Sequence, residues 1–455
     1  MIGIGSDNAS VIVGLNNGVY IKLKEDIPTM VHIRCVCHSL QLAVSHACSE
    51  TMPRNLEFLV SETYNWFARS SSRQQAYIDL FKLINDGHEP LKIVRACQTR
   101  WLSIASAVPR LCDQWLELKT HFGLTKSSER CYTSEMLHSL YSDEYDHAYL
   151  VFLKSVLNEV QRVNKIFESN DCDPTKLLQD LTLLIENLVN RVMLPSNRHR
   201  VDPFSCNLEE YLDPKLNLGY DTEKLLSDLP KHLHEDREKT LRERCSQFLV
   251  FLIKELRNRL PDNVQILKTM SLFSVENTLR VVKNSIVPLL EFFNISAENI
   301  TKIEFQWSNI TLVKWNETKN TVKFWAEVNE YKDAANINPY KELANIAITM
   351  LSLPHSNAEI ERVFSQMNLI KNKLRNKMKT DTTNALLHIR YGSNRMSETC
   401  VSYNFPNEVL DLIPSNDKYR CSQESTIDQP GPSRTVTDEA NIDDDDDLNI
   451  ILQTM

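Results

Sequence analysis

Apolar residues recur at helical spacing along most of the chain. Between positions 56 and 84 they fall at Leu56, Leu59, Val60, Tyr64 and Phe67. This is the one-sided pattern of an amphipathic helix. Similar patterns predict helices at 39–48, 149–167, 176–192 and 238–260. The pattern therefore predicts a mostly helical protein.

Strand-like patterns are fewer. The apolar run from Ile2 to Ile4 leads directly into Asp7, as expected for a strand that presents an acid at its end. Small and amide residues around Asp7 let the backbone turn and a ligand approach. A second short strand is predicted at 90–94.

A further helix is predicted after Pro354. Ser356 and Glu359 have the spacing of a capping box, in which each side chain bonds the backbone of the other. An apolar stripe follows at Ile360, Val363, Phe364, Met367 and Ile370. This helix would carry Glu361 about one and a half turns from its start. Without further context, Glu361 is equally well explained as a solvent-facing acid of an amphipathic helix.

Composition narrows the class of protein. The chain has 455 residues, enough for two or three domains, and only 9 glycines. No apolar run approaches the roughly 20 residues that span a bilayer, and no secretory leader pattern stands at the start. The 11 cysteines are scattered and odd in number, which favours free thiols over a disulfide framework. These features predict an intracellular protein.

Charge is unevenly distributed. Of the net charge of −9, residues 415–455 carry 10 acids and 3 bases. Residues 1–414 are therefore nearly neutral and lack the broad basic field of an autonomous DNA-binding protein. A local run of Lys371, Lys373, Arg375, Lys377 and Lys379 remains. It could contact phosphates, although such runs are usually solvated helix faces.

Four segments resemble motifs of the hAT superfamily of DNA transposases, and they follow one another in the order found in that family. The first is the Ser-Asp step at Asp7, and the second is the Cys-x-x-His element of Cys35 and His38. The third is Thr-Arg-Trp-Leu-Ser, which contains Arg100 and Trp101. The fourth is Glu-Arg-Val-Phe-Ser, which begins at Glu361. Four elements in order are more specific than any one of them.

The resemblance implies a ribonuclease-H-like fold with three metal-binding carboxylates. Asp7 matches the second of these and Glu361 the third. In the family they hold two Mg²⁺ ions, roughly 4 Å apart, that activate the attacking hydroxyl and stabilise the leaving oxygen in DNA cleavage. The family's first aspartate lies on an earlier strand, and only six residues precede Asp7. We therefore expect a chain truncated before its first catalytic strand and its zinc-finger region, and inactive as given.

The same resemblance assigns DNA contacts. His38 would be a polar group near the scissile DNA, and Trp101, next to Arg100, would stack on a flipped base. Lys371, Lys373 and Arg375 would contact phosphates. The simpler interpretation of Trp101 is a core aromatic residue.

The implied fold class is α/β plus all-α: an incomplete ribonuclease-H-like domain interrupted by a large all-helical insertion. Four domains are expected. Residues 1–121 would form the partial catalytic domain and residues 122–335 the helical insertion. Residues 336–395 would form the C-terminal part of the catalytic fold with the dimerisation region, and residues 396–455 a disordered acidic tail. The apolar residues of 343–351 and 386–389 fit either a dimerisation surface or the core. A short apolar run at 448–452 could be a peptide that binds another protein.

Zinc is a rival chemistry to magnesium. Cys35, Cys37, His38, His46 and Cys48 lie close in sequence. Their spacing differs from the paired Cys and His ligands of structural sites, so zinc is disfavoured.

Three functions are compatible with these patterns. The leading hypothesis is an inactive or domesticated transposase remnant: a nuclear protein that self-associates, with residual DNA contact. The second is a fragment of an active transposase whose start is wrongly assigned. The third is a protein-binding scaffold without a DNA role.

Overall fold

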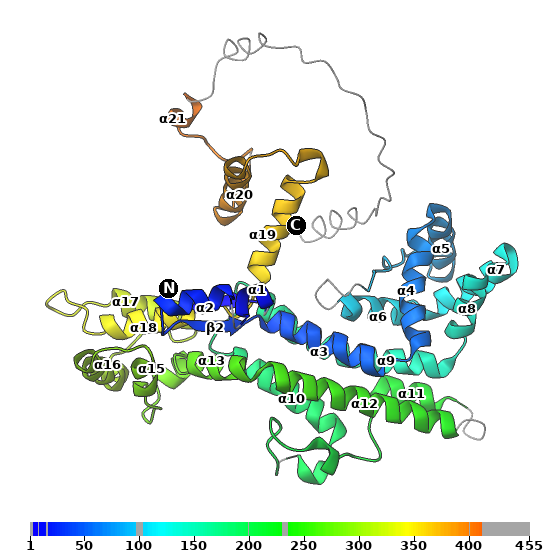
Figure 1. Cartoon of the computed structure of the whole chain (residues 1–455), viewed down its shortest axis with the longest axis horizontal. Coiled ribbons are helices and arrows are strands. Elements are labelled where there is room, and N and C mark those ends of the chain that lie inside the picture. Colours follow the sequence, from blue (N-terminus) through cyan, green and yellow to red (C-terminus); the bar gives the residue numbers. More distant parts are fainter. Residues whose placement is uncertain are drawn as a thin grey trace. The chain divides into compact units, whose positions relative to one another are not determined.

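The computed structural model consists of two compact units, Met1–Asn368 and Leu369–Met455 (Figure 1). It describes residues 3–7, 9–14, 17–96, 103–198, 200–229, 235–399 and 401–411. Helices account for 68% of the described residues and strands for 3%. The prediction of a mostly α protein is therefore confirmed.

The first unit begins with a parallel pair of strands. β1 (Gly3–Ser6) pairs with β2 (Val31–Arg34). Two helices, α1 (Ser10–Val13) and α2 (Val19–Asp26), connect them, as a parallel pairing requires a crossover. The strand predicted before Asp7 is confirmed, displaced by one or two residues.

The strand predicted at 90–94 is wrong. Residues 91–96 form no regular element. The backbone carbonyls of this segment accept hydrogen bonds from side chains of α6 (Ser103–Asp113) and the residue after it. Gln114 Nε2 donates to the carbonyl of Leu91 at 3.0 Å, and Arg110 donates to that of Lys92 at 2.5 Å.

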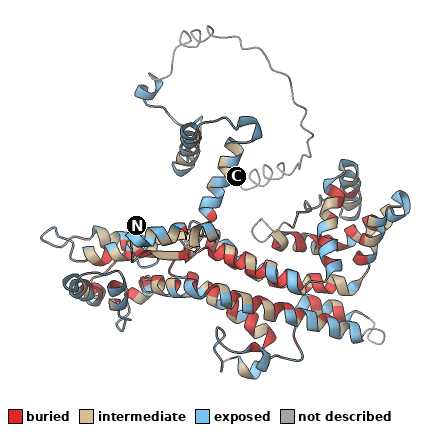
Figure 2. Ribbon diagram, viewed as in Figure 1, coloured by how far each residue is buried: buried red, intermediate tan, exposed pale blue. Residues whose placement is uncertain are grey.

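Three long helices form the centre of the first unit. They are α3 (Val36–Thr51), α9 (Glu144–Glu168) and α12 (Glu235–Arg259). Each packs against the other two, and Figure 2 shows the buried residues concentrated along them. The rings of Phe152 and Phe248 meet edge to face at 6.2 Å between centroids. This core matches the helices predicted at 39–48, 149–167 and 238–260.

A cluster of helices lies between α3 and α9 in the chain. It comprises α4 (Arg54–Ala68), α5 (Ser71–Ile84), α6 (Ser103–Asp113), α7 (Trp115–Glu129) and α8 (Tyr132–Tyr141). The single helix predicted over 56–84 is thus two helices. The break falls at Ser70, whose hydroxyl accepts the Arg73 N–H and caps α5.

The remaining helices of the first unit follow α9. They are α10 (Leu177–Val192), η1 (Pro195–Asn197), η2 (Leu208–Glu210), α11 (Tyr220–Ser227), α13 (Pro261–Ser271), α14 (Val275–Thr278), α15 (Val287–Phe292), α16 (Ala297–Asn309), η4 (Ile310–Leu312), α17 (Thr321–Glu330), α18 (Lys341–Leu351) and α19 (Ala358–Ile370). The last two residues of α19 belong to the second unit. That unit also contains η5 (Lys373–Arg375), α20 (Thr380–Arg395) and α21 (Asn407–Leu410).

Helix α18 is part of the core. Leu343, Ala344, Ala347 and Met350 are all buried. The sequence left open whether this run is core or a dimerisation surface, and the burial decides for the core.

A buried histidine, His121, and a half-buried one, His147, make stability depend on pH. Burial lowers the pKa of His121 and of His147 to about 4. His121 Nε2 accepts the Trp66 indole N–H at 3.2 Å, and His147 stacks on Trp115 with centroids 4.3 Å apart. The neutral form is therefore favoured in the folded state.

We expect the free energy of unfolding to fall by about 2 kcal/mol for each of these two histidines between pH 7 and pH 5. The unfolded chain, with a histidine pKa near 6.5, binds the proton before the folded chain does, so stability is lost as pH falls. Urea unfolding of His147→Phe should show a smaller loss than the unchanged chain. The matched control is His388→Phe, at an exposed position of α20. An unchanged pH dependence in His147→Phe would contradict the assignment.

Candidate functional site

Asp7 directly follows β1. The end of this strand is fixed by the residue after β2, because Cys35 N–H donates to the carbonyl of Ser6 at 2.8 Å. Asp7 is partly exposed. Its Oδ1 accepts the Ala9 N–H at 3.0 Å, which is a local side-chain turn. The predicted position of an acid at a strand end is confirmed.

Glu361 lies in the first turns of α19 and is exposed. Its N–H donates to the carbonyl of Asn357 at 3.0 Å, which makes Asn357 the residue that caps the helix. The predicted capping box at Ser356 and Glu359 is therefore wrong. The Ser356 hydroxyl donates instead to the carbonyl of Phe167, at the end of α9, at 2.7 Å.

Residues 353–357, here called the approach segment, pack against β1. A methyl group placed on Gly5 would lie 3.0 Å from Asn357 Oδ1 and 3.1 Å from Pro354 Cγ. One placed on Gly3 would lie 2.6 Å from Leu353 Cδ2. A side chain at Gly5 would push Asn357 and Pro354 back by a few tenths of an ångström, whereas one at Gly3 would displace the flexible end of Leu353. The strand that leads to Asp7 and the segment that leads to Glu361 are neighbours, although about 350 residues separate them.

The approach segment and α19 are also fixed to the helical core. Asn357 N–H donates to Cys35 Sγ at 3.2 Å. Arg362, next to Glu361, donates to the carbonyl of Glu168 and to Asn170 Oδ1, the latter at 3.1 Å. The end of α9 therefore contributes directly to the placement of Glu361. No local sequence signal pointed to this contribution.

His355, in the approach segment, contacts a cysteine of the region just after α9. His355 Nε2 lies 3.4 Å from Cys172 Sγ. Burial lowers the pKa of His355, so the imidazole is neutral near pH 7. The contact adds a further bond between the approach segment and the chain just after α9.

Among the candidate zinc ligands, Cys35 and Cys37 interact with each other, whereas His46 faces a different group. Cys37 is buried and its thiol contacts the carbonyl of Asn164 at 3.8 Å. The neighbouring Cys35 and burial both raise the pKa of Cys37. His46 Nδ1 faces Glu255 at 3.2 Å, and burial raises the pKa of Cys48 to about 12. His38 is partly exposed, in the first turn of α3.

Magnesium needs several oxygen ligands. Within the described ranges, no group of three or more His, Cys, Asp or Glu side chains is placed to hold a metal ion. Asp7 and Glu361 thus fit a two-metal site only in part.

The basic run forms an exposed segment of the second unit. Lys371, Lys373 and Arg375 are exposed, as are Lys377 and Lys379. Asn372 Oδ1 accepts the N–H groups of Leu374 and Arg375 at 3.0 and 3.1 Å, which fixes η5. A hollow of about 520 Å³ follows η5 and is lined by residues 374–379 and Thr382. Arg100 and Trp101 lie outside the described residues.

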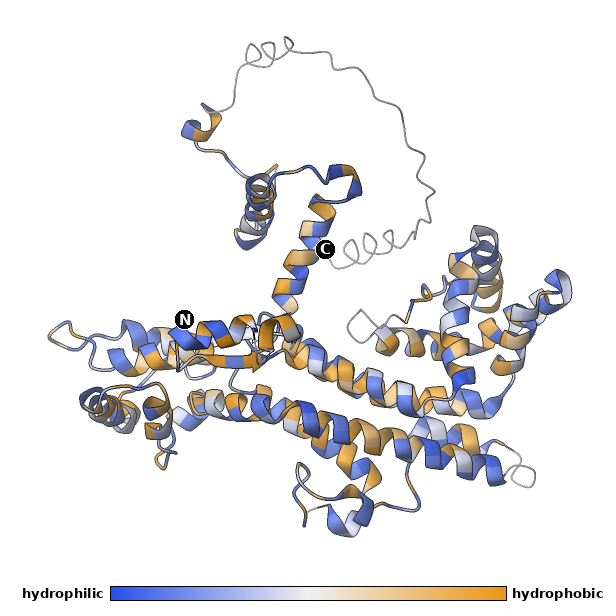
Figure 3. Cartoon of the chain, in the orientation of Figure 1, coloured by the Kyte–Doolittle hydropathy of each residue, from blue (hydrophilic) through white to orange (hydrophobic). Residues whose placement is uncertain are grey.

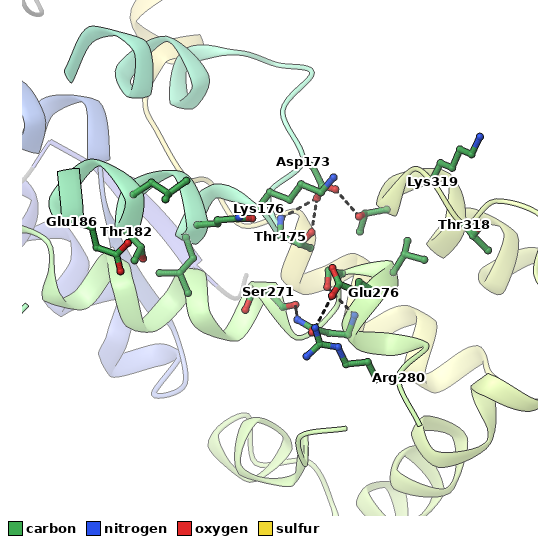
Figure 4. A pocket seen from close by; sticks show the side chains of 17 residues that line it. Asp173, Thr175, Lys176, Thr182, Glu186, Ser271, Glu276, Arg280, Thr318 and Lys319 are labelled. Atoms are coloured by element: carbon green, nitrogen blue, oxygen red, sulfur yellow. Dashed lines mark hydrogen bonds and ion pairs between the residues drawn. The ribbon is translucent and has the colours of Figure 1, made fainter. Parts of the chain in front are cut away.

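A second hollow, of about 640 Å³, lies between α10, α14 and α17 (Figure 4). Three of the charged side chains that line it, Asp173, Glu276 and Arg280, are engaged with neighbours. Asp173 accepts hydrogen bonds from Thr175 and Thr321, both at 2.7 Å, and Arg280 pairs with Glu276. No pattern in the sequence pointed to this hollow, and its mixture of acids and bases indicates no particular ligand.

Apolar side chains remain exposed on α19 and α20. Ile360 and Phe364 of α19 are 53% and 48% exposed, and Ile389 of α20 is 65% exposed. Figure 2 shows few buried residues in either helix, and Figure 3 shows hydrophobic positions along both. On each helix, apolar surface is left available for another partner.

Comparison with known proteins identifies this part of the chain. Residues 306–393 match the family model of the hAT family C-terminal dimerisation region. The match shows that these residues resemble that region of hAT-family proteins. No curated protein matches the chain. The hAT match extends from the end of α16 through α20, so it contains Glu361 and the basic run but neither Asp7 nor His38.

One further finding concerns the membrane. Among the described residues, no helix combines the length and apolar character that a membrane crossing requires.

The contacts of Arg362 predict how α19 is held. In Arg362→Met, we expect hydrogen exchange of the amides in the first turns of α19 to speed up by about fivefold, since two hydrogen bonds to the end of α9 are lost. The control is Arg390→Met, an exposed arginine of α20, which should leave α19 unchanged. Equal exchange in all three proteins would show that Arg362 does not hold the helix.

Proposed function

We propose that this hAT-transposase-related chain associates with a second copy of itself through the apolar faces of α19 and α20. The observation that carries the proposal is the exposure of these faces inside a region that matches a dimerisation family model. The finer assignment, to particular side chains, is our own.

Helix α19 has the pattern of an interface helix. Ile360, Val363, Phe364 and Met367 recur at helical spacing, yet Ala358 is its only buried residue. A stripe of this kind normally faces a core. Removing apolar surface from water contributes about 25 cal/mol per Å², so pairing with another copy would stabilise it.

Helix α20, in the second unit, also has apolar residues that are not buried. Leu386 and Leu387 are half-buried and Ile389 is exposed, and Thr383 is the only buried residue of the helix. A twofold dimer presents the same surface from both subunits. Each unit would then contribute one apolar helix to the contact.

For catalysis, we propose that the chain as given does not cleave DNA. Residues 1–121 and 336–395 would derive from a ribonuclease-H-like domain, with 122–335 as its helical insertion and 396–455 as an acidic tail. Asp7 and Glu361 would be two of three ancestral magnesium ligands. The adjacency of their two segments supports this assignment. The alternatives are a fragment of an active metal-dependent transposase, and a protein-binding scaffold without a DNA role.

We also propose a DNA contact through the basic run, in a protein that acts in the nucleus. Its support is the exposure of Lys371, Lys373 and Arg375 on one short segment. His38, Arg100 and Trp101 would add contacts by their resemblance to the family's motif residues.

The dimer proposal predicts a monomer when a charge enters the α19 stripe. Burying an Ile or Phe side chain contributes about 1.5–3 kcal/mol, and each side chain occurs twice in a symmetric dimer. Phe364→Glu should therefore raise the dissociation constant of the dimer by at least about 100-fold. Sedimentation velocity over a concentration series measures this constant.

The matched control is Phe58→Glu on α4, where Phe58 is 36% exposed and lies outside the hAT match. This variant should sediment like the unchanged chain. A Phe364→Glu protein that remains a dimer would exclude α19 as the interface.

The DNA proposal predicts a change in salt dependence. Replacing Lys371, Lys373 and Arg375 together by Gln should weaken binding to a duplex DNA. The slope of log affinity against log salt should decrease by about 3, since about 0.9 counterions are released per phosphate contact. Fluorescence anisotropy measures both quantities. The triple control Lys215, Lys224 and Lys239 to Gln removes the same charge from exposed positions elsewhere, and it should bind as the unchanged chain does.

A further inference from the structure

The basic run carries an unusual density of uncompensated charge. Residues 371–379, here called the basic segment, hold five bases in nine positions and no acid. Within the part of the chain that the structure describes, none of the five takes part in an ion pair. Like charges this close repel one another, so a nearby anionic partner would lower the energy of the segment.

The basic segment also has an apolar component. Leu374, at its centre, is 94% exposed. Leu374 and Met378 line the hollow of about 520 Å³ together with Arg375, Lys377 and Lys379. A partner that suits this surface is acidic and carries apolar side chains next to its acids.

One stretch of the same chain has this composition. Seven acids lie between positions 438 and 447: Asp438, Glu439 and Asp443–Asp447. Leu448, Ile450, Ile451 and Leu452 follow at once. Residues 438–452, here called the acidic segment, therefore match the basic segment in charge and in the presence of apolar side chains.

We propose that the acidic segment binds the basic segment of its own chain. The chain is long enough for this contact. Helix α20 begins directly after the basic segment and, with 16 residues, is about 24 Å long. The 26 residues between Asp411 and Asp438 can extend to about 90 Å.

The covalent link favours the chain's own segment over a separate partner. A tethered segment is present at a high effective concentration, in the millimolar range for short links. It therefore occupies the basic segment until a competing polyanion displaces it. In combination with the proposed DNA contact, on which this consequence rests, the acidic segment lowers the affinity for DNA.

The first test does not depend on DNA binding. A carbodiimide joins lysines to carboxylates that touch them, and mass spectrometry of the full-length chain locates the links. We expect links from Lys371, Lys373, Lys377 and Lys379 to residues 438–447, several-fold more often than from the exposed reference lysines Lys314 and Lys332. The links should weaken at 1 M salt, where charges are screened beyond about 3 Å.

An isotope mixture identifies the origin of the acidic segment. In an equimolar mixture of ¹⁵N-labelled and unlabelled chains, links should join segments of the same label. Links of mixed label would overturn the assignment to the same chain. Links spread equally over reference and basic-segment lysines would overturn the contact itself.

The second test uses DNA. Replacing Asp443–Asp447 together by Asn should raise the affinity for a duplex DNA by about tenfold at low salt. The gain should vanish when Lys371, Lys373 and Arg375 are also replaced by Gln. If the unchanged chain and the Asn variant both fail to bind DNA while the specific cross-links form, the DNA proposal fails and the segment contact stands.

Discussion

The close approach of residues 353–357 to β1 is the contact on which the candidate site depends. Gly5 faces the side chains of Asn357 and Pro354 so closely that a methyl group would lie only 3.0 to 3.2 Å from them. Hydrogen bonds from Asn357 to Cys35 and from Ser356 to Phe167 then fix the segment. Glu361 follows one turn later, so its place relative to Asp7 depends on the packing of residues 353–357 against β1 and not on a contact between the two acids.

The helical core links both parts of this contact. Helix α3 begins directly after Cys35, and α9 ends beside Phe167, whose carbonyl receives the Ser356 hydroxyl. Both helices pack against α12. The helices between Asp7 and Glu361 in the chain therefore help to hold the segments that carry these two acids, and the same helices form the buried core.

Helices α18 and α19 show how similar patterns lead to different outcomes. Both have apolar residues at helical spacing. In α18 these residues are buried, whereas Ile360 and Phe364 of α19 are about half exposed. Only the neighbours of each helix distinguish a core face from a surface that is available to another subunit. The sequence alone could not make this distinction.

Periodicity and local turn chemistry act within a few residues, so the sequence correctly predicted the helical character, the strand before Asp7 and the helix that carries Glu361. It failed where distant groups decide: Ser356 bonds the end of α9 instead of capping its own helix, and the backbone at 91–92 is bonded by Gln114 and Arg110 instead of a strand. The meeting of β1 with the approach segment was decided only by the tertiary structure, since it depends on packing between residues about 350 positions apart.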